Sequence, residues 1–379
     1  MTGTGEAVNG TGGATTGVRL GVVGLGLMGR VHARNALDLG ASVVAGADVA
    51  PDSREAFDAE FDVDCYESHD ALFDEADVDA VVVTTPNKYH EAAATAALEA
   101  GFDVLVEKPL AHSLESAERI DGAAADAPGN CMLGFHSRFS PAATATRAYA
   151  DAGRFGEITH VEATFVRRRG IPSPGSWFTT ADLSGGGSLI DVGVHVVDLA
   201  LFVLGFPDLV EVSGATRSNF GGRDDYADPD GFAATWSGGS DTFDVDDSVS
   251  AFLRFATGQT LSLEVAWATN RPPASELVVR GTSAGAAFEM EGEVVELYET
   301  GNHGVDHYVT SEIDARGGPE GHVAEMEHFL EASAAGVLPT MNTVDQGLAV
   351  QRVIDAIYRS SESGRAVALE AASTDARSY

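Results

Sequence analysis

The glycine-rich stretch at residues 24–29, Gly-Leu-Gly-Leu-Met-Gly, constrains what this chain can fold into more than any other feature. A short apolar run precedes it and a helical pattern follows it, which is typical of a strand that turns into a helix. Gly24 permits a tight turn, Gly26 lets backbone approach a ligand, and Gly29 lets the helix pack on the strand. The helix N-terminus behind such a loop attracts a pyrophosphate.

An acidic residue in the right place supports dinucleotide binding. Asp48 closes the next expected strand, at 42–47, roughly 20 residues after the glycine motif, where a carboxylate bonds the adenosine ribose. Asp48 favours NAD over NADP because it would repel the 2′-phosphate of NADP. Arg54 lies downstream and would soften this preference, but we favour the alternative that it is a solvated helix residue. Leu27 and Met28 of the glycine loop are expected to line the cofactor.

The charge balance excludes several partners. The 379 residues include 58 acidic and 23 basic ones, a formal net charge of −35. Nucleic acids and acidic lipid surfaces need a basic protein surface, so we expect neither. The acids are spread through periodic, apolar segments, which favours a surface adapted to high salt and a halophilic source. With no apolar run of roughly 18 residues and no leader signal, we expect a cytoplasmic protein.

The basic residues include only two lysines, Lys88 and Lys108. A surface that has lost almost all lysine is expected to keep it where arginine cannot serve, because the lysine amine is a compact donor whose pKa shifts. Lys108 belongs to Glu107-Lys108-Pro109, which ends the expected strand at 103–107. Ligands bind outside the carboxyl ends of parallel strands, so this amine can meet a sugar hydroxyl and a cofactor ribose.

We expect no metal. Cys65 and Cys131 match no metal-binding spacing and are interpreted as buried free thiols. One C-terminal histidine pair flanks a glycine in a polar stretch, and another lies on an expected helix as surface or interface residues. These pairs are His303 with His307 and His322 with His328.

Alternating strands and helices in the first part predict parallel βαβ units and a doubly wound sheet. Repeated β-runs follow later and predict a largely antiparallel sheet, closed by two helices. We therefore expect an α/β protein with a large, mostly antiparallel open sheet in its second domain. The expected divisions are a disordered tail at 1–17, a Rossmann domain at 18–138 and a substrate-binding and oligomerisation domain at 139–379.

A second constellation lies where a glycine loop feeds an apolar helix. Asp191, His195 and Asp198 follow one another at spacings of four and three and so share a helix face. An acid beside a histidine fixes its tautomer and raises its pKa toward working pH, as a general acid/base needs. Two structural alternatives together carry the same weight as this functional interpretation. Asp191 only completes a capping box with Ser188, or His195 is a satisfied core histidine.

Six segments occur in a fixed order: Gly-Leu-Gly-Leu-Met-Gly (24–29), Thr-Pro-Asn-Lys-Tyr-His (85–90), Glu-Lys-Pro (107–109), Gly-Phe-His-Ser-Arg-Phe-Ser-Pro (134–141), Gly-Gly-Gly-Ser-Leu-Ile-Asp-Val-Gly-Val-His-Val-Val-Asp (185–198) and Val-Asp-Asp-Ser (245–248). With them the chain resembles the Gfo/Idh/MocA family of nicotinamide-dependent sugar and polyol oxidoreductases. The resemblance implies a Rossmann domain followed by an α/β domain whose open sheet often forms the subunit interface, hence a homodimer or homotetramer.

The resemblance also implies roles for individual residues. Lys108 would contact the substrate and the nicotinamide ribose, often with a cis bond before Pro109. His195 would be the general acid/base, and Asp191 would orient His195 or bind the substrate. The residues expected to line the cofactor are Thr85, Pro86, Asn87, His90, Glu107 and Lys108 itself.

Arginines supply further substrate candidates. The run at 167–169, with Trp177 nearby, suggests a substrate-facing loop for a carboxylate, a phosphate or a sugar face, with interface salt bridges as an equal alternative. A strand alternates its faces, so only some of these arginines point inward; Arg168 and Trp177 are the candidates. Arg138 matches a recurrent arginine at the domain junction, and its alternative is a structural salt bridge.

Our leading hypothesis is an NAD(P)-dependent oxidoreductase, NAD-preferring, that moves a hydride between a carbinol carbon of a sugar or cyclic polyol and nicotinamide. Two alternatives stay open: a glycosidase that uses bound NAD without net redox turnover, and a non-catalytic NAD-sensing regulator. Retention of Lys108, Asp191 and His195 disfavours the regulator. The sequence names neither the sugar nor the carbon that is oxidised.

Overall fold

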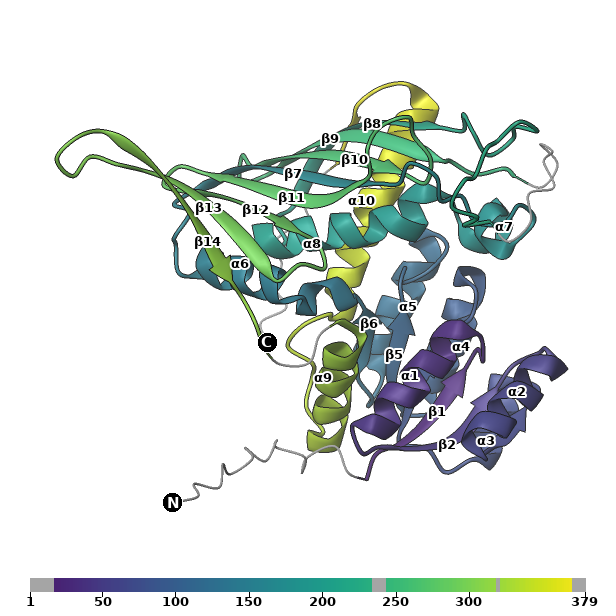
Figure 1. Ribbon diagram of the computed structural model, residues 1–379. Helices are drawn as coiled ribbons and strands as arrows, with labels where there is room; N and C mark the ends of the chain where they lie inside the picture. Colours follow the sequence, from purple (N-terminus) through teal and green to yellow (C-terminus); the bar gives the residue numbers. More distant parts are fainter. Residues whose placement is uncertain (1–16, 234–242, 318–320, 370–379) are drawn as a thin grey trace, which may run out of the picture.

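The computed structural model describes residues 17–233, 243–317 and 321–369 (Figure 1). Its first part is a six-stranded parallel sheet in the order β3-β2-β1-β4-β5-β6. Strand order reverses between β1 and β4, which makes this the switch point where ligands bind. The predicted doubly wound sheet is confirmed, and the expected tail lies outside the described residues apart from Gly17.

Each strand of this sheet is a short run, apolar at its centre, as expected when both faces are buried. The strands are β1 (Arg19–Val23), β2 (Ser42–Ala47), β3 (Asp64–Tyr66), β4 (Ala80–Val83), β5 (Asp103–Glu107) and β6 (Cys131–Gly134). The helices between them are α1 (Leu27–Asp38), α2 (Pro51–Phe61), α3 (His69–Glu75), α4 (His90–Glu99) and α5 (Leu114–Asp126), with a short 3₁₀ turn η1 (Asn87–Tyr89) before α4.

The second part is built on a nine-stranded sheet in the order β14-β13-β12-β11-β7-β10-β9-β8-β15. All its pairs are antiparallel except β7 with β10, so the prediction of a mostly antiparallel sheet is confirmed. The strands are β7 (Ile158–Val166), β8 (Leu209–Arg217), β9 (Ser248–Phe255), β10 (Thr260–Ala266), β11 (Ala274–Gly281), β12 (Gly285–Glu289), β13 (Val294–Gly301), β14 (His307–Asp314) and β15 (Val367–Ala368).

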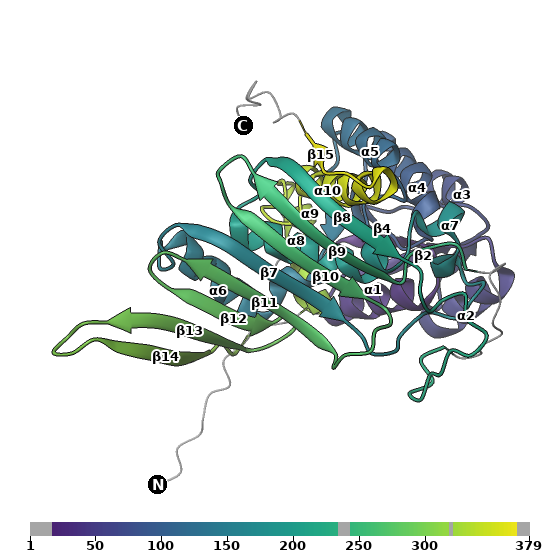
Figure 2. The same ribbon diagram turned by 90° about the horizontal axis from the view of Figure 1, so that it is seen from above.

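Three helices cover the face of this sheet that points toward the Rossmann part (Figure 1). Seen from above, the strands lie in front of these helices, so the opposite face carries none of the three (Figure 2). They are α6 (Pro141–Asp151), α8 (Val194–Leu204) and α10 (Val344–Ser363). Shorter segments are η2 (His136–Phe139), η3 (Trp177–Thr179), α7 (Ala181–Ser184) and the π-helical η4 (Leu189–Gly193).

One stretch, Ala181–Leu204, is long and apolar enough to cross a membrane by length and composition alone. It corrects the expectation that the chain holds no such stretch. In the fold, 89% of its most apolar window is buried inside the protein, between the large sheet and the Rossmann part. That burial is typical of a core helix rather than of a lipid-facing one.

The chain returns to the Rossmann part near its end. Helix α9 (Gly321–Ala335), which we expected in the second domain, packs against α1 instead. Its side chains Met326, Phe329 and Leu330 belong to the same buried cluster as Leu20 of β1. The sequence pattern could not show this because an amphipathic helix does not reveal which partner covers its apolar face.

A buried ion pair joins η2 to α8. Arg138 and Asp198 are both fully buried, and the guanidinium donates to both carboxylate oxygens and to Gln346 of α10. The rings of Phe135 and Phe206 pack around it. Arg138 is therefore the structural salt bridge that we held as its alternative, and its buried guanidinium has no surface to offer a substrate.

Breaking this pair should destabilise the protein strongly. Arg138→Met leaves the Asp198 carboxylate buried without its cation, and we expect a loss of about 3–5 kcal/mol in the free energy of unfolding. Denaturant unfolding followed by circular dichroism in molar KCl measures it. The control, Arg254→Gln, removes an exposed pair with Glu211 and should change stability by less than about 0.5 kcal/mol. Equal losses in both variants would contradict this.

Candidate active site

The glycine loop is shaped by close backbone contacts at two of its three glycines. Gly24 has a positive φ of 95°, and a Cβ there would lie 2.7 Å from the Thr84–Thr85 backbone. A Cβ on Gly29 would lie 2.1 Å from the Gly24 carbonyl oxygen, whereas one on Gly26 would meet no atom within 4 Å. Gly24 and Gly29 therefore close the loop on itself, and Gly26 faces open space, as a phosphate cradle requires.

The first turn of α1 adds to this cradle. Its N-cap is Gly26, which makes no side-chain capping bond, so the first-turn amides stay free for an anion. Leu27 is 70% exposed at the start of the helix, and Met28 is half-buried beside it. The buried Thr85 hydroxyl, at the end of β4, has no hydrogen-bond partner in the part of the chain that the structure describes. These groups fit a bound dinucleotide.

The carboxylate of Asp48 organises the end of β2. It accepts the Leu25 amide of the glycine loop and the Ala50 amide, both at 2.8 Å. The Arg54 guanidinium donates to the Asp48 carbonyl at 2.7 Å and to that of Val49 at 3.2 Å. Arg54 is thus not the solvated helix residue that we favoured. It lies at the strand end where the adenosine ribose is expected.

Two predicted cofactor residues hold loops in place. The His90 ring is buried, with one nitrogen 2.8 Å from the Thr85 carbonyl and the other 2.9 Å from that of Pro109. The buried Asn87 side chain donates to the Ser184 carbonyl at 2.8 Å. Both side chains therefore position the segments that form the site, and Asn87 is also among the residues that line the pocket beside Lys108.

The two lysines differ in their surroundings. Lys88 forms an exposed ion pair at 2.6 Å with Asp182 of α7. Lys108 is mostly buried and donates to the Asp191 carbonyl at 3.0 Å and to its carboxylate at 3.3 Å. The peptide bond between Lys108 and Pro109 is cis, as the resemblance implied. The contact joins the end of β5 to η4 and brings the two predicted motifs together.

Asp191 is neither a helix cap nor a partner of His195. Its second carboxylate oxygen accepts the indole N–H of the buried Trp267 at 2.9 Å. Ser188 donates instead to Asp246 at 2.7 Å, which rules out the capping box. Because η4 is π-helical, the spacing of four between Asp191 and His195 does not stack their side chains as an α-helix would. Nothing in the sequence pattern indicated Trp267.

His195 is buried, and positively charged side chains surround it. Its Nδ1 has no hydrogen-bond partner within the described ranges, and its ring meets that of His136 edge-on at 5.0 Å. Burial, followed by the charges of Lys108, His136, His322 and Arg167, holds the pKa of His195 well below its ordinary value. We expected an acid to raise it, so this expectation is wrong. A neutral imidazole is ready to accept a proton.

A row of histidines leads away from His195. The ring of His136 packs at a tilt against that of His322, with 3.9 Å between the ring centres, and the His322 ring meets that of His32 edge-on at 5.7 Å. His322, which we interpreted as a surface or interface residue, thus belongs to the site region. His136 lies in a quoted motif, but no sequence signal links it to His32 or His322, since they come from separate elements.

Glu107 lies at the inner end of this row. It is buried, and its carboxylate contacts the His32 ring nitrogen at 2.7 Å. Burial alone would raise its pKa, but the hydrogen bond and charge of His32, with Lys108, outweigh this and lower it. Glu107 is therefore an anion that holds His32, and its backbone leads directly into Lys108.

A small pocket lies between Lys108 and Asp191, with Trp177 and Phe178 among the residues that line it. The two aromatic rings stack at 3.8 Å, so they form one apolar platform beside the amine. Trp177, a predicted substrate residue, thus lies at the same pocket as Lys108 and Asp191.

The three arginines at 167–169 have different surroundings, as expected where a strand ends and alternate side chains face opposite sides. Arg168 is exposed to solvent, whereas the charge of Arg167 acts on His195, so Arg167 rather than Arg168 lies toward the site. Arg169 donates to the Ala227 carbonyl at 3.0 Å and packs on Tyr226, which anchors a loop.

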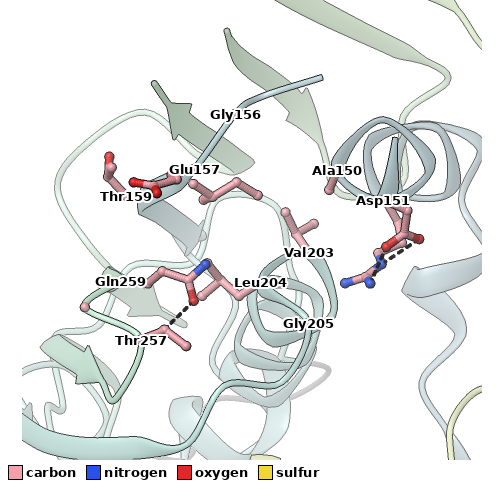
Figure 3. A pocket seen from close by; sticks show the side chains of 13 residues that line it. Ala150, Asp151, Gly156, Glu157, Thr159, Val203, Leu204, Gly205, Thr257 and Gln259 are labelled. Atoms are coloured by element: carbon pink, nitrogen blue, oxygen red, sulfur yellow. Dashed lines mark hydrogen bonds and ion pairs between the residues drawn. The ribbon is translucent and has the colours of Figure 1, made fainter. Parts of the chain in front are cut away.

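Larger hollows lie elsewhere. Figure 3 shows one of about 1020 Å³ at the C-terminal end of α8, lined by the β9–β10 turn and by Asp151 and Glu157. It contains none of the residues assembled above and no partly buried base. Lys108 and Asp191 line the smaller pocket instead.

The two cysteines do not form a disulfide. Both are free thiols, but Cys65 is only half-buried, which corrects that part of the expectation. Burial raises the pKa of Cys131 to about 12, so this thiol is inert at neutral pH.

The cradle at the switch point fits a nicotinamide dinucleotide, and a neutral imidazole and an amine lie in the adjoining domain junction. These features define a dinucleotide-dependent oxidoreductase. Residues 18–135 match an oxidoreductase family with an NAD-binding Rossmann fold, and residues 144–287 match the GFO/IDH/MocA C-terminal domain. The chain belongs to the Gfo/Idh/MocA family.

Individual relatives agree with this assignment. The chain is 35% identical over 284 residues to a putative UDP-kanosamine synthase oxidoreductase subunit of Amycolatopsis mediterranei, covering 71% of this chain and 74% of that protein. It is 32% identical over 295 residues to D-glucoside 3-dehydrogenase of Escherichia coli, covering 77% and 79%. A solved oxidoreductase domain protein from Kribbella flavida has a TM-score of 0.80 at 26% identity, covering 94% of this chain and 100% of that one.

Two alanine substitutions should separate the roles of the loop glycines. Gly26→Ala meets no atom of the protein, so we expect unchanged stability and NAD(H) binding weakened at least about tenfold, because the methyl group occupies the phosphate approach. Gly24→Ala is strained by its positive φ and should lower the melting temperature. Thermal unfolding and calorimetric titration with NADH measure both. Tight binding by Gly26→Ala would contradict the cradle.

Proposed function

We propose that the protein oxidises a secondary hydroxyl of a pyranoside or cyclic polyol, with His195 as base and Lys108 as hydrogen-bond donor to the same oxygen. The contact of Lys108 with Asp191, beside a buried, neutral His195, carries this proposal. Among the relatives, names such as D-glucoside 3-dehydrogenase, levoglucosan dehydrogenase and inositol 2-dehydrogenase support the substrate class.

The chain's own groups divide the work as follows. Asp48 and the α1 amides would hold the dinucleotide, whose nicotinamide supplies hydride chemistry when bound. His195 accepts the proton of the hydroxyl, since its neutral ring has a lone pair. The Lys108 amine donates to the oxygen and stabilises its developing negative charge. Asp191, fixed by Trp267, holds the amine in place.

The aromatic platform is proposed to receive the substrate ring. Trp177 and Phe178 present an apolar face, which suits the C–H face of a pyranose, while Lys108 and Asp191 supply polar contacts on the other side of the small pocket. Arg167, which acts on His195 electrostatically, adds a positive charge near the reacting oxygen.

Features of the whole molecule belong to the same proposal. The bare face of the large sheet supports a homodimer or homotetramer (Figure 2). The net charge of −35 supports a halophilic, cytoplasmic protein, because salt screens its self-repulsion.

A reduction screen with NAD and NADP in molar KCl, over glucosides, levoglucosan, xylose and inositols, tests the activity. Net reduction of added cofactor separates it from a redox-neutral glycosidase, and no turnover of any sugar with intact NAD binding would favour a regulator.

Replacing the proposed base should cost turnover but not cofactor binding. His195→Ala is expected to lower kcat about 10²–10⁴-fold. The acid limb of the wild-type kcat/KM profile should lie below about pH 6.5, because the surrounding charges favour the neutral ring, and the variant should lose this limb. Steady-state kinetics across pH and NADH fluorescence titration measure these effects. A control, His69→Ala, alters a histidine outside the site. A loss smaller than tenfold for His195→Ala would contradict the assignment.

Cofactor choice is proposed to rest on Asp48. Asp48→Ser keeps an acceptor for the loop amides but removes the charge that repels a 2′-phosphate, and it leaves Arg54 nearby. The ratio of kcat/KM for NADP to that for NAD should rise at least about tenfold. The control Asp52→Ser removes an exposed charge of the next helix and should leave the ratio unchanged. A wild type that already prefers NADP would overturn this.

A further inference from the structure

A buried cluster beside Glu107 has the composition of a metal centre. His32 comes from α1, and His322 and Glu325 come from the first turn of α9. Each offers a nitrogen or oxygen ligand atom, and these atoms lie within 4.8 Å of one another. Among the described residues this is the one such group of histidines and carboxylates. The two helices that carry it pack against each other.

The ligand atoms are left without other partners. His32 Nδ1, His322 Nδ1 and Glu325 Oε2 are all buried, and none has a hydrogen bond within the described part of the chain, although His322 Nδ1 and Glu325 Oε2 lie 3.6 Å apart. His32 and Glu325 are fully buried side chains. A buried polar atom without a partner costs about 1–3 kcal/mol. Three such atoms facing one another are explained together by a single ion that binds all of them.

The outer contacts of the cluster orient its ligands. Glu107 holds the Nε2 side of His32 at 2.7 Å, so Nε2 carries the proton and the Nδ1 lone pair faces the cluster. A carboxylate behind a ligating histidine is the usual support of a metal site. Asn342 donates to Glu325 Oε1 at 3.4 Å, which leaves Oε2 free, and the adjoining ring of His136 fixes that of His322.

The charges of the buried side chains also favour a bound cation. Glu107 has His32 and Lys108 as positive neighbours, whereas burial and the charge of Glu107 raise the pKa of the fully buried Glu325, so Glu325 carries its negative charge only beside a further cation. Two imidazoles and one carboxylate are ligands of zinc and neighbouring transition metals rather than of calcium or magnesium, which prefer oxygen alone. Two ligand atoms of a tetrahedral zinc ion lie about 3.4 Å apart, so a pair separated by the full 4.8 Å must close by about 1.4 Å when the ion binds.

We propose that His32, His322 and Glu325 bind a divalent transition-metal ion of the zinc class, which fastens α9 to α1. Water would complete the coordination. The ion would lie behind Glu107 and hold His322 against His136, so it would stiffen the support of the nicotinamide site from outside. No cysteine takes part, and the ligands come from opposite ends of the chain, which is why a search for ligand spacings does not find the site. The proposal does not depend on the proposed function.

Metal content tests the site directly. The full-length chain, without an affinity tag and in molar KCl, is stripped with EDTA, reloaded with Zn²⁺ and passed through gel filtration before mass-spectrometric metal analysis. We expect about one zinc ion per wild-type chain, and about a tenth of that or less in His322→Ala and Glu325→Gln. The matched control His328→Ala removes another partly buried histidine of α9, whose ring packs on Phe139, and should retain zinc.

A second measurement does not rely on the variants folding. Co²⁺ titration of the stripped wild-type chain should produce visible ligand-field absorption that saturates near one equivalent, and Zn²⁺ should abolish it. The melting temperature of the wild type should rise with Zn²⁺ more than that of His322→Ala. Wild-type chain with neither retained zinc nor a cobalt spectrum would overturn the proposal, as would equal zinc retention by the wild type and both ligand variants.

Discussion

The contact between the Lys108 amine and Asp191 holds the two halves of the molecule in register. Lys108 extends from the end of β5, and Asp191 lies on η4 beneath the large sheet. A mostly buried amine needs a carboxylate partner, and Trp267 fixes that partner by its indole N–H. The domain junction is therefore set by a charged contact inside the site itself, and His195 follows on the next helix turns.

The electrostatics of the site differ from those of the surface. The chain carries a net charge of −35, yet His195 is surrounded by Lys108, Arg167 and two other histidines. These positive groups keep the ring neutral and favour negative charge on an oxygen beside it. One arrangement therefore keeps the histidine unprotonated and stabilises the oxyanion, whereas a carboxylate next to the histidine would strengthen the base but oppose the oxyanion.

The far end of the chain supports the cofactor side. Helix α9 packs on α1, whose first turn borders the phosphate cradle. His322 of α9 belongs to the row of histidines that ends at Glu107. Met326, Phe329 and Leu330 bury apolar surface in the same contact. Residues remote in sequence from the glycine loop thus hold α1 in place. The Rossmann part is therefore complete only when α9 packs against it.

Local patterns determined a good part of this protein. The glycine loop, the Asp48 strand end, the β5 lysine and the glycine-fed helix could all be predicted, because each depends on neighbours in sequence and on the periods of strand and helix. The tertiary structure decided the partners. Asp191 pairs with Lys108 and Trp267, Asp198 with Arg138, and His322 joins His136. Side-chain partners and buried pKa values depend on which elements pack together, and no local pattern encodes that.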